Sequence, residues 1–353
     1  MINLIYDKKI ILIGILFVSY KYIIKRFFQP KISVFLPIYN MQDYIRNAIN
    51  SIQKQTLKDI EIVAVNDYST DNSYNILKEL ALKDKRIKII NNTKNFGLLY
   101  SRAMGILHSS GEYLINLDPD DEFNDSDNLE YLYNITLRNK VDIVTFETLY
   151  KNKNRILRFC KESNIIIKQP RLIDSFFIYV DKHFNDIIIW NKLIKKEIFL
   201  KAYKIFENYI YYKKWNYYED NIWSLLVHKV SNSKICVDKL IYIYNNNLNK
   251  ESLMKNRANF LEFTNKIYLF EMKRKILNNI IYKKYLSHEC NKLIAYMNKS
   301  KNLKKYIESD IVIRNKIIYN IKSCIKYYEI SNNNKKIIVN LFKYIFDNYL
   351  IYI

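Results

Sequence analysis

Two short apolar runs in this chain end in acidic turns, and this pattern constrains the fold more than any other feature. Residues 113–117 lead into an Asp-Pro-Asp-Asp turn at residues 118–121, and residues 60–65 lead into a turn with two aspartates at residues 66–71. Parallel strands gather ligand-binding groups at their carboxyl ends. Carboxylates crowded there repel one another unless a hard cation such as Mg2+ or Mn2+ lies among them. The pattern predicts a parallel sheet with a metal-diphosphate site at one edge.

Short apolar runs alternate with amphipathic stretches from residue 31 onward, which is typical of a mostly parallel sheet flanked by helices. The expected strands are residues 32–38, 60–65, 87–90, 113–117 and 141–146, and the expected helices are residues 41–55, 71–83, 98–108 and one that begins near residue 126. Residues 174–180, 191–202 and 221–229 also show helical spacing of apolar side chains. The predicted fold class is therefore α/β, with a Rossmann-like sheet.

The composition divides the chain into three parts. Residues 1–30 are a hydrophobic segment, residues 31–253 carry the α/β pattern, and residues 254–353 are a Lys-, Ile- and Tyr-rich helical region. The N-terminal apolar run is shorter than the about 20 residues that span a bilayer, so we expect either a marginal anchor or a helix on the membrane surface. If the segment spans the membrane, the basic residues after it place the body of the protein on the cytoplasmic side. For the C-terminal helices, we favour packing against the α/β part over membrane contact.

The chain carries 57 Lys and Arg against 35 Asp and Glu, a formal net charge of +22. These basic residues are spread along the whole length without a nucleic-acid-binding motif, which argues against nucleic acid as a partner. An anionic membrane surface fits the same charge. The four cysteines, Cys160, Cys236, Cys290 and Cys324, lie far apart with no paired metal spacing, and we expect free thiols.

Each acidic motif has a structural explanation when it is taken alone. An isolated Asp-x-Asp is more often a solvated turn, Asp71 is suited to cap the next helix, and Glu219-Asp220 suits a helix N-terminus. A calcium loop is excluded because Phe123 and Leu129 replace its required Gly and Glu. The glycine-rich loops of dehydrogenases and P-loop enzymes are absent. The position of the two acidic turns after apolar runs favours a metal site.

A series of ordered motifs resembles those of the family 2 glycosyltransferases. They are residues 34–40 (Val-Phe-Leu-Pro-Ile-Tyr-Asn), the turn at 66–71, residues 95–105 with Asn95, Gly97 and Arg102, the turn at 118–121, and then Trp190-Asn191-Lys192-Leu193, Tyr218-Glu219-Asp220-Asn221 and Tyr242-Ile243-Tyr244. The last three look like the acceptor half of bacterial polysaccharide members. The resemblance implies a GT-A fold in which residues 31–146 bind a nucleotide-sugar and residues 147–253 face the acceptor.

The resemblance also implies a role for each site residue. The implied nucleotide-sugar contacts are Pro37, Tyr39, Asn40, Asp67, Arg102 and Asp118, the implied ligands of Mn2+ or Mg2+ are Asp118 and Asp120, and the acceptor side carries Trp190 and Glu219. Asp67 would read the base, most often uracil, and Asp220 would be the general base. Direct displacement needs such a base on the face opposite the leaving group, and it inverts the anomeric configuration. The metal neutralises charge on the departing diphosphate.

Two residues depart from the family pattern. Tyr68 replaces the usual Gly of the nucleotide turn, although Tyr tolerates a positive φ poorly, and Asn245 stands where Arg is common. The leading hypothesis is a non-processive, inverting, metal-dependent glycosyltransferase that uses a UDP-sugar and a glycan or lipid-linked acceptor. The alternatives are a non-catalytic relative that binds a nucleotide-sugar or glycan, and a nucleotidyltransferase, which the missing glycine-rich loop disfavours.

Overall fold

The computed structural model describes residues 29–157, 163–169, 188–210 and 219–245, with residues 290–291, 293–294, 317–322, 324, 335 and 338 nearer the C-terminus. The strands are β1 Ile32–Ile38, β2 Ile60–Asn66, β3 Ile87–Asn91, β4 Tyr113–Asn116, β5 Glu122–Phe123, β6 Ile143–Tyr150, β7 Arg155–Leu157, β8 Ile166–Lys168, β9 Lys192–Lys195 and β10 Ser233–Tyr244. The helices are α2 Ile45–Gln53, α3 Ser73–Lys83, α4 Leu98–His108, α5 Asn128–Asn139, α7 Lys196–Ile210 and α8 Glu219–Val230, with a short 3-10 helix, η1, at Lys151–Lys153.

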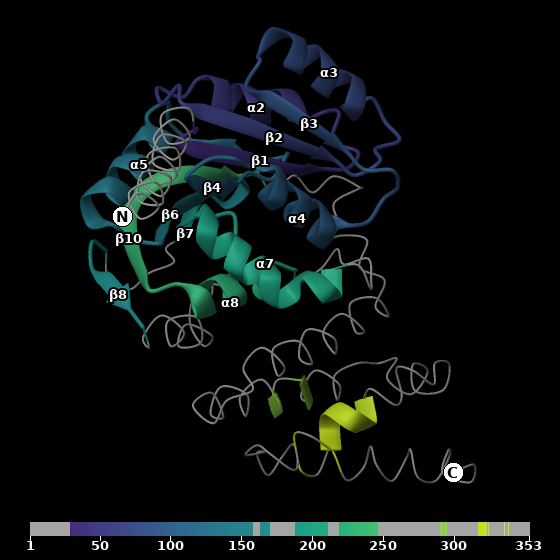
Figure 1. Ribbon diagram of the computed structural model, residues 1–353, viewed down its shortest axis with the longest axis vertical. Helices are drawn as coiled ribbons and strands as arrows, with labels where there is room; N and C mark the ends of the chain where they lie inside the picture. Colours follow the sequence, from purple (N-terminus) through teal and green to yellow (C-terminus); the bar gives the residue numbers. More distant parts are fainter. Residues whose placement is uncertain are drawn as a thin grey trace, which may run out of the picture.

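The strands form one twisted sheet in the order β3-β2-β1-β4-β9-β6-β10-β5, with β7 beside β6 and β8 beside β10 (Figure 1). Strands β3, β2, β1 and β4 are parallel. All seven residues of β1 are buried, as expected for a parallel strand covered on both faces. The turns after β1, β2 and β4 therefore meet at one edge of the sheet.

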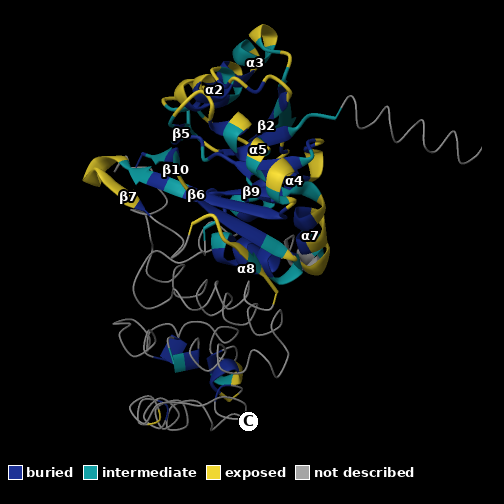
Figure 2. Ribbon diagram, turned by 90° about the vertical axis from the view of Figure 1, so that its left-hand side faces the viewer, coloured by how far each residue is buried: buried dark blue, intermediate teal, exposed yellow. Residues whose placement is uncertain are grey.

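Helices cover both faces of the sheet and form two separate apolar cores. On one face Ile49 of α2, Leu77 of α3 and Leu132 of α5 pack against the sheet, and on the other α4, α7 and α8 contribute Leu99, Phe199 and Trp223. Figure 2 shows the strands buried between these layers and the exposed residues on the outer faces of the helices. The predicted α/β class is confirmed.

The second half of the sheet differs from the sequence-based expectation. The predicted helix over residues 191–202 is wrong at its start, because Lys192–Lys195 forms strand β9 and α7 begins at Lys196. Strand β9 runs antiparallel to both β4 and β6 and fills the space between them. Backbone pairing on both sides thus outweighs the local helical spacing of apolar residues, a tertiary effect that periodicity alone does not reveal.

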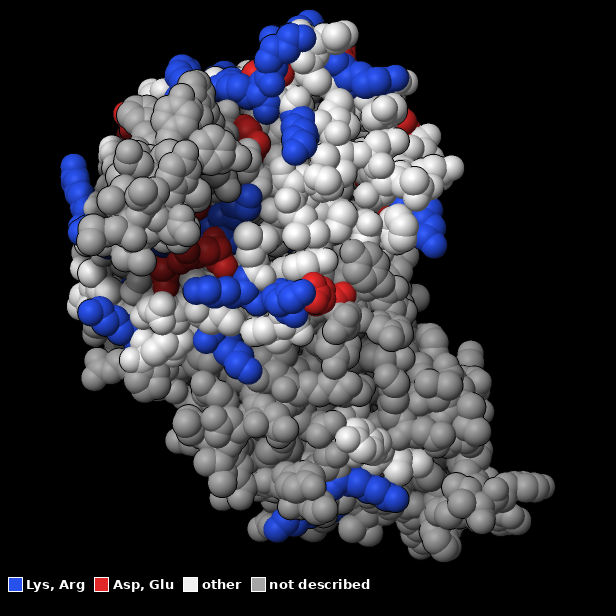
Figure 3. Space-filling view, viewed as in Figure 1, with Lys and Arg blue, Asp and Glu red and all other residues white. Residues whose placement is uncertain are grey.

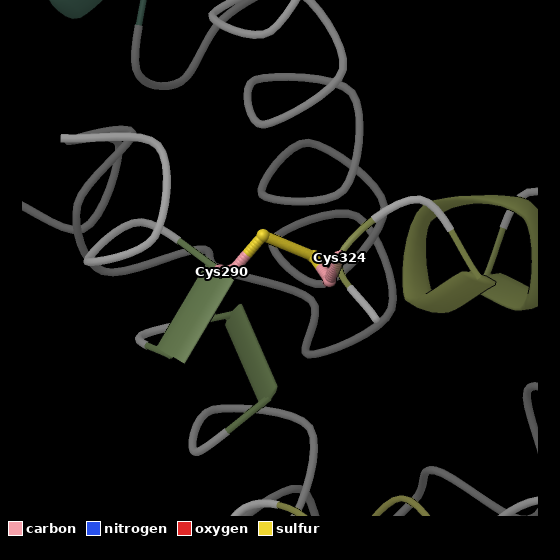
Figure 4. The surroundings of a disulfide bond; sticks show 2 residues. All are labelled: Cys290 and Cys324. Carbon is pink, nitrogen blue, oxygen red and sulfur yellow. A yellow bond between two sulfur atoms is a disulfide. The ribbon is translucent and has the colours of Figure 1, made fainter. Parts of the chain in front are cut away.

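The cysteines also differ from expectation. Cys290 and Cys324 form a disulfide, with Cα atoms 5.8 Å apart, within the C-terminal region (Figure 4). Cys236 of β10 is also disulfide-bonded. The expectation of free thiols is therefore wrong for these three residues, because the distance between cysteines along the sequence does not determine their distance in the fold. Cys160 lies outside the described residues.

The two terminal regions lie largely outside the described residues, including positions 1–28 of the predicted N-terminal segment. Within the described ranges, no helix has the length and apolar character needed to cross a membrane. On the face shown in Figure 3, the Lys and Arg side chains of the described residues lie in separate places on the surface, with acidic side chains between some of them. This distribution agrees with their even spread along the sequence.

Candidate active site

Arg102 of α4 connects the two halves of the candidate site. The side chain is 2% exposed. Its Nη2 atom donates to Asp118 Oδ1 at 2.9 Å, and its Nη1 atom donates to Glu219 Oε1 at 2.6 Å and also to Asp220 Oδ1. Its Nε atom donates to Oδ1 of Asn116 at 3.1 Å. One buried guanidinium group thus joins a carboxylate from the turn after β4 to two carboxylates at the start of α8.

Burial changes the pKa values of the ionisable groups in this cluster. It is the largest influence on Asp220 and raises the pKa of that carboxyl to about 7, although Arg102 acts in the opposite direction. Burial likewise raises the pKa of Glu219, again against the influence of Arg102. Burial disfavours the charge of Arg102 itself, but the three surrounding carboxylates outweigh it and raise the pKa of the guanidinium above its ordinary value. A perturbed carboxyl beside a fixed cation is typical of a functional site.

The Asp-Pro-Asp-Asp turn is anchored by its last carboxylate. The Tyr242 hydroxyl donates to Asp121 Oδ2 at 2.8 Å, and the backbone N–H of Asn245 donates to Oδ1 at 2.7 Å. The same Tyr242 hydroxyl accepts a hydrogen bond from the backbone N–H of Asp118 at 3.1 Å. Asp121 therefore ties the turn to the end of β10. Burial raises its pKa well above the ordinary value.

Asp118 and Asp120 form a donor set that fits a divalent metal. The Asp120 carboxylate accepts no hydrogen bond from another described residue, and burial, followed by the charge of Asp118, raises its pKa to about 7. A divalent cation would offset this repulsion. The described residues contain no group of three or more His, Cys, Asp or Glu side chains that would hold a metal. Two carboxylates suit a cation such as Mg2+, which takes further ligands from phosphate and water.

A cavity of about 210 Å3 opens beside Asp120. Its walls come from the start of α2, the acidic turn, η1 and the residue after β10, with Asn47, Lys151 and Asn245 among the lining side chains. Asp120 and Asp121 of the acidic turn therefore border this cavity.

Asp67 forms a second group of contacts at the ends of β2 and β3. Its Oδ1 atom accepts hydrogen bonds from Asn92 Nδ2 at 2.8 Å and from the Phe96 N–H at 2.9 Å, and its Oδ2 atom accepts from the Gly97 N–H at 2.8 Å. These bonds fix the loop that begins α4. A carboxylate has about four acceptor positions, so a further hydrogen bond, such as one from a base N–H, is compatible with this arrangement.

Asn40 connects the turn after β1 to the turn after β2. Its Oδ1 atom accepts from the Thr70 N–H at 2.8 Å, and its own N–H donates to Ser69 Oγ at 3.1 Å. Tyr39, beside it, is 43% exposed, whereas Pro37 is buried in β1, beyond the residues that pair with β4. No hydrogen bond of the described residues directly joins this group or Asp67 to the Arg102 cluster.

Tyr68 adopts the conformation that the usual Gly would adopt. Its φ is 61°, and its side chain is 54% exposed. The turn therefore keeps a left-handed residue at this position, although a side chain there costs about 1–2 kcal/mol.

We expect Tyr68→Gly to be more stable than Tyr68→Ala by about 1 kcal/mol, because Ala keeps the strained Cβ atom and Gly removes it. Comparing these two variants in urea unfolding separates backbone strain from the loss of the aromatic ring, which both share. A Tyr68→Ala protein as stable as Tyr68→Gly would contradict the proposed strain.

Trp190 lies against the aromatic residues that hold the acidic turn. Its ring stacks on Tyr242 at 4.7 Å and on Tyr244 at 5.4 Å between ring centroids. Because the Tyr242 hydroxyl contacts Asp118 and Asp121, the structure brings Trp190 into the neighbourhood of the turn.

Sequence reasoning missed several residues that shape the site. Asn116, which links Arg102 to Asp118, was visible as a polar residue at the end of an apolar run. Asp121 was part of the noted turn, but its anchoring contact was not predictable from that turn alone. Lys192 is fully buried on β9, and its only sequence signal was its place in the Trp-Asn-Lys-Leu motif.

Comparisons with known proteins agree with this architecture. Residues 33–199 match the model of Glycosyl transferase family 2. The uncharacterized glycosyltransferase EpsJ of Bacillus subtilis is 29% identical over 226 residues, which cover 62% of this chain and 62% of EpsJ. The chain thus spans less than two thirds of the length of that relative.

Two solved structures share the fold. The S. aureus TarS 1-349 complex with UDP-GlcNAc gives a TM-score of 0.60 at 19% identity, covering 85% of this chain and 82% of TarS 1-349. The Pyrobaculum calidifontis mannosyltransferase PcManGT, in complex with GDP-Man and Mn2+, gives a TM-score of 0.50 at 12% identity, covering 91% and 88%. The fold is that of the GT-A glycosyltransferases. Within that class, residues 33–199 of this chain are similar to glycosyl transferase family 2.

Proposed function

We propose that this protein transfers one sugar from a nucleotide-sugar, of the UDP class, to a hydroxyl group of a glycan or lipid-linked acceptor, with Mn2+ or Mg2+ as cofactor. The observation that carries the proposal is the Arg102 cluster. It holds Asp118, from the half assigned to the donor, and Asp220, from the half assigned to the acceptor, on one buried guanidinium group. A transferase needs this juxtaposition because its two substrates react at one point.

In this proposal, Asp220 is the general base. A carboxyl with a pKa near 7 is partly ionised at neutral pH and is basic enough to take a proton from a hydroxyl group as it attacks. The acceptor oxygen bonds to the anomeric carbon while the bond from that carbon to the diphosphate oxygen breaks. The proton passes to Asp220, and the nucleoside diphosphate leaves from the opposite face. The anomeric configuration is therefore inverted.

The donor lies along the edge where β1, β2 and β4 end. Asp67 accepts a hydrogen bond from the base, with Pro37, Tyr39 and Asn40 nearby, and this arrangement suits the single N–H of uracil. The co-crystallised donor of the TarS fragment, UDP-GlcNAc, supports a UDP-sugar.

Asp118 and Asp120 would hold the divalent metal ion of the donor site. When bound, the cation supplies electrostatic stabilisation of the leaving group. The Mn2+ in the mannosyltransferase complex supports this assignment. Arg102 keeps Asp118 in place through two contacts with its carboxylate, at 2.9 and 3.3 Å.

The acceptor side carries Trp190 and Glu219. Aromatic rings and carboxylates are suited to the apolar faces and hydroxyl groups of sugars. In this proposal, the hydrophobic N-terminal segment brings the protein to the cytoplasmic surface of a membrane, where lipid-linked acceptors reside, as a peripheral protein or through a single anchor, and the positive net charge of the chain suits an anionic surface.

The nucleotide-metal site is tested by UDP binding. We expect UDP with Mn2+ to raise the Tm of the full-length protein and EDTA to reverse most of that rise. In Asp120→Ala, the metal-dependent part of the rise in Tm should be lost, and the affinity for UDP in the presence of Mn2+ should be at least about tenfold weaker. Asp125→Ala, at an exposed aspartate in the next loop, between β5 and α5, is the control and should behave like the wild type. Equal, metal-independent binding by all three proteins would contradict the assignment.

A further inference from the structure

Lys192 is a buried cation to which the proposed function gives no role. It is 0% exposed, and its Nζ atom donates hydrogen bonds to Asn191 Oδ1 at 2.6 Å and to the carbonyl oxygen of Ile188. Removing a charged ammonium group from water is costly unless opposite charge compensates it. Its surroundings should therefore contain carboxylates.

The register of the sheet places Lys192 beside the Arg102 cluster. On one side it pairs with Thr145 of β6. On the other side Asn116 of β4 comes opposite Lys192, one residue beyond the pair formed by Ile115 and Leu193. Opposed residues on neighbouring strands share a face and have Cβ atoms about 4.5–5.5 Å apart. Asn116 in turn accepts a hydrogen bond from Arg102 and donates one to Asp118 at 2.8 Å.

The charges around Asp220 come from four elements. Arg102 on α4 donates a hydrogen bond to it, whereas Asp118 in the turn after β4, Glu219 on α8 and Lys192 on β9 act on it electrostatically. Lys192 supplies the second positive charge, and like Arg102 it lowers the pKa of Asp220 against the larger effect of burial.

We propose that Lys192 is a positioning residue for the transfer reaction, whose buried positive charge lies on the β9 side of the Arg102 cluster and favours the ionised, proton-accepting form of Asp220. Lys192 exchanges no proton in the reaction, and the acceptor proton passes to Asp220 alone. The inference rests on the proposed function, because it assigns Lys192 a role only through the base.

The test is the pH dependence of UDP release between pH 5 and 9 in the full-length protein. The substrates are UDP-GlcNAc, UDP-glucose and UDP-galactose with Mn2+, and the quantity compared is the midpoint of the acid limb of kcat/KM. In Lys192→Met we expect this midpoint to rise by about one pH unit, because an opposite charge nearby lowers a carboxyl pKa by about 1–3 units. Lys192→Arg keeps the charge and should stay near the wild-type midpoint.

Lys234→Met is the matched control. Lys234 is 1% exposed on β10 of the same sheet but is not among the groups with the largest effect on Asp220. A loss of folded protein lowers the rate at every pH without moving the midpoint, so stability is separated from the proposed effect. Lys192→Gln, which is also neutral and keeps a polar end group, replaces Lys192→Met if the latter does not fold.

An active wild type with an unchanged midpoint in the neutral Lys192 variant would overturn the inference and leave the proposed function standing. A Lys192→Arg midpoint displaced as far as that of the neutral variant would also overturn it, because charge would then not be the cause. If the wild type released no UDP from any of the three sugars at any pH, the proposed function would be overturned, and this inference with it.

Discussion

Replacing Asp220 by Asn should reduce glycosyl transfer by about 10²–10⁴-fold while UDP binding in Mn2+ stays close to that of the wild type. The amide has nearly the shape of the carboxylate, and its oxygen still accepts a hydrogen bond from Arg102 Nη1. It has no basic oxygen to take the acceptor proton. The fold should tolerate the change because the buried cluster loses one of three like charges.

The measurement is single-turnover transfer beside UDP affinity for both proteins. Asp142→Asn is a matched control, since Asp142 is also buried and accepts a backbone hydrogen bond from Asn232 at 2.7 Å, but lies outside the Arg102 cluster. This control should keep its rate per folded molecule. An Asp220→Asn protein with the wild-type rate would refute the assignment, and Glu219, whose Oε2 atom is buried without a hydrogen-bond partner, would be the next residue to replace.

Arg102→Met should destabilise the protein by about 3–5 kcal/mol near neutral pH and abolish transfer. Removing one partner of a buried ionic cluster leaves the other charges uncompensated. Here Asp118, Glu219 and Asp220 would face one another without the guanidinium group. Arg102→Lys keeps the charge but not the planar fork that contacts all three, so its loss should be intermediate.

The pH dependence of this loss follows from the carboxylates. Without Arg102 the pKa values of Glu219 and Asp220 in the folded state rise further above those of the unfolded chain, so the folded variant binds protons more readily than the unfolded one. The variant should therefore recover part of its stability as the pH falls from 8 to 5. Urea unfolding at both pH values measures this.

Arg46→Met is the control for the Arg102 variant. Arg46 pairs with Glu79 on the surface, with both side chains well exposed, and its replacement should change stability little. An Arg102→Met protein no less stable than Arg46→Met would contradict the central place given to the buried cluster.

Local sequence patterns were sufficient to predict the elements of the parallel half of the sheet. The predicted strand at residues 32–38 and the predicted helix at residues 98–108 coincide with β1 and α4. Continuous apolar runs and helical spacing are properties of neighbouring residues, so they are visible without knowledge of tertiary contacts. Strand β9 was not visible in this way, because a four-residue strand is stabilised by the two strands beside it.

The candidate site was likewise predictable only in part from local sequence patterns. The motifs pointed to Arg102, Asp118, Glu219 and Asp220 separately, but their meeting on one guanidinium group depends on how α7, which packs against both α4 and α8, places the start of α8 near Arg102. The different partners of the carboxylates at residues 118–121 depend on the directions of side chains within one turn. The burial of Lys192 was missed because a lysine between an asparagine and a leucine carries no local sign of burial, and only the sheet register places it beside Asn116.

The most direct test of the central claim is the release of nucleoside diphosphate from a panel of nucleotide-sugars by the full-length protein, with Mn2+ and with EDTA. The panel contains UDP-GlcNAc, UDP-glucose, UDP-galactose and GDP-mannose. We predict slow release from a UDP-sugar, accompanied by a rise in Tm, and loss of both on chelation. Stabilisation without release in the presence of candidate glycan acceptors would favour the non-catalytic relative. Neither stabilisation nor release with any member of the panel would contradict a nucleotide-sugar transferase.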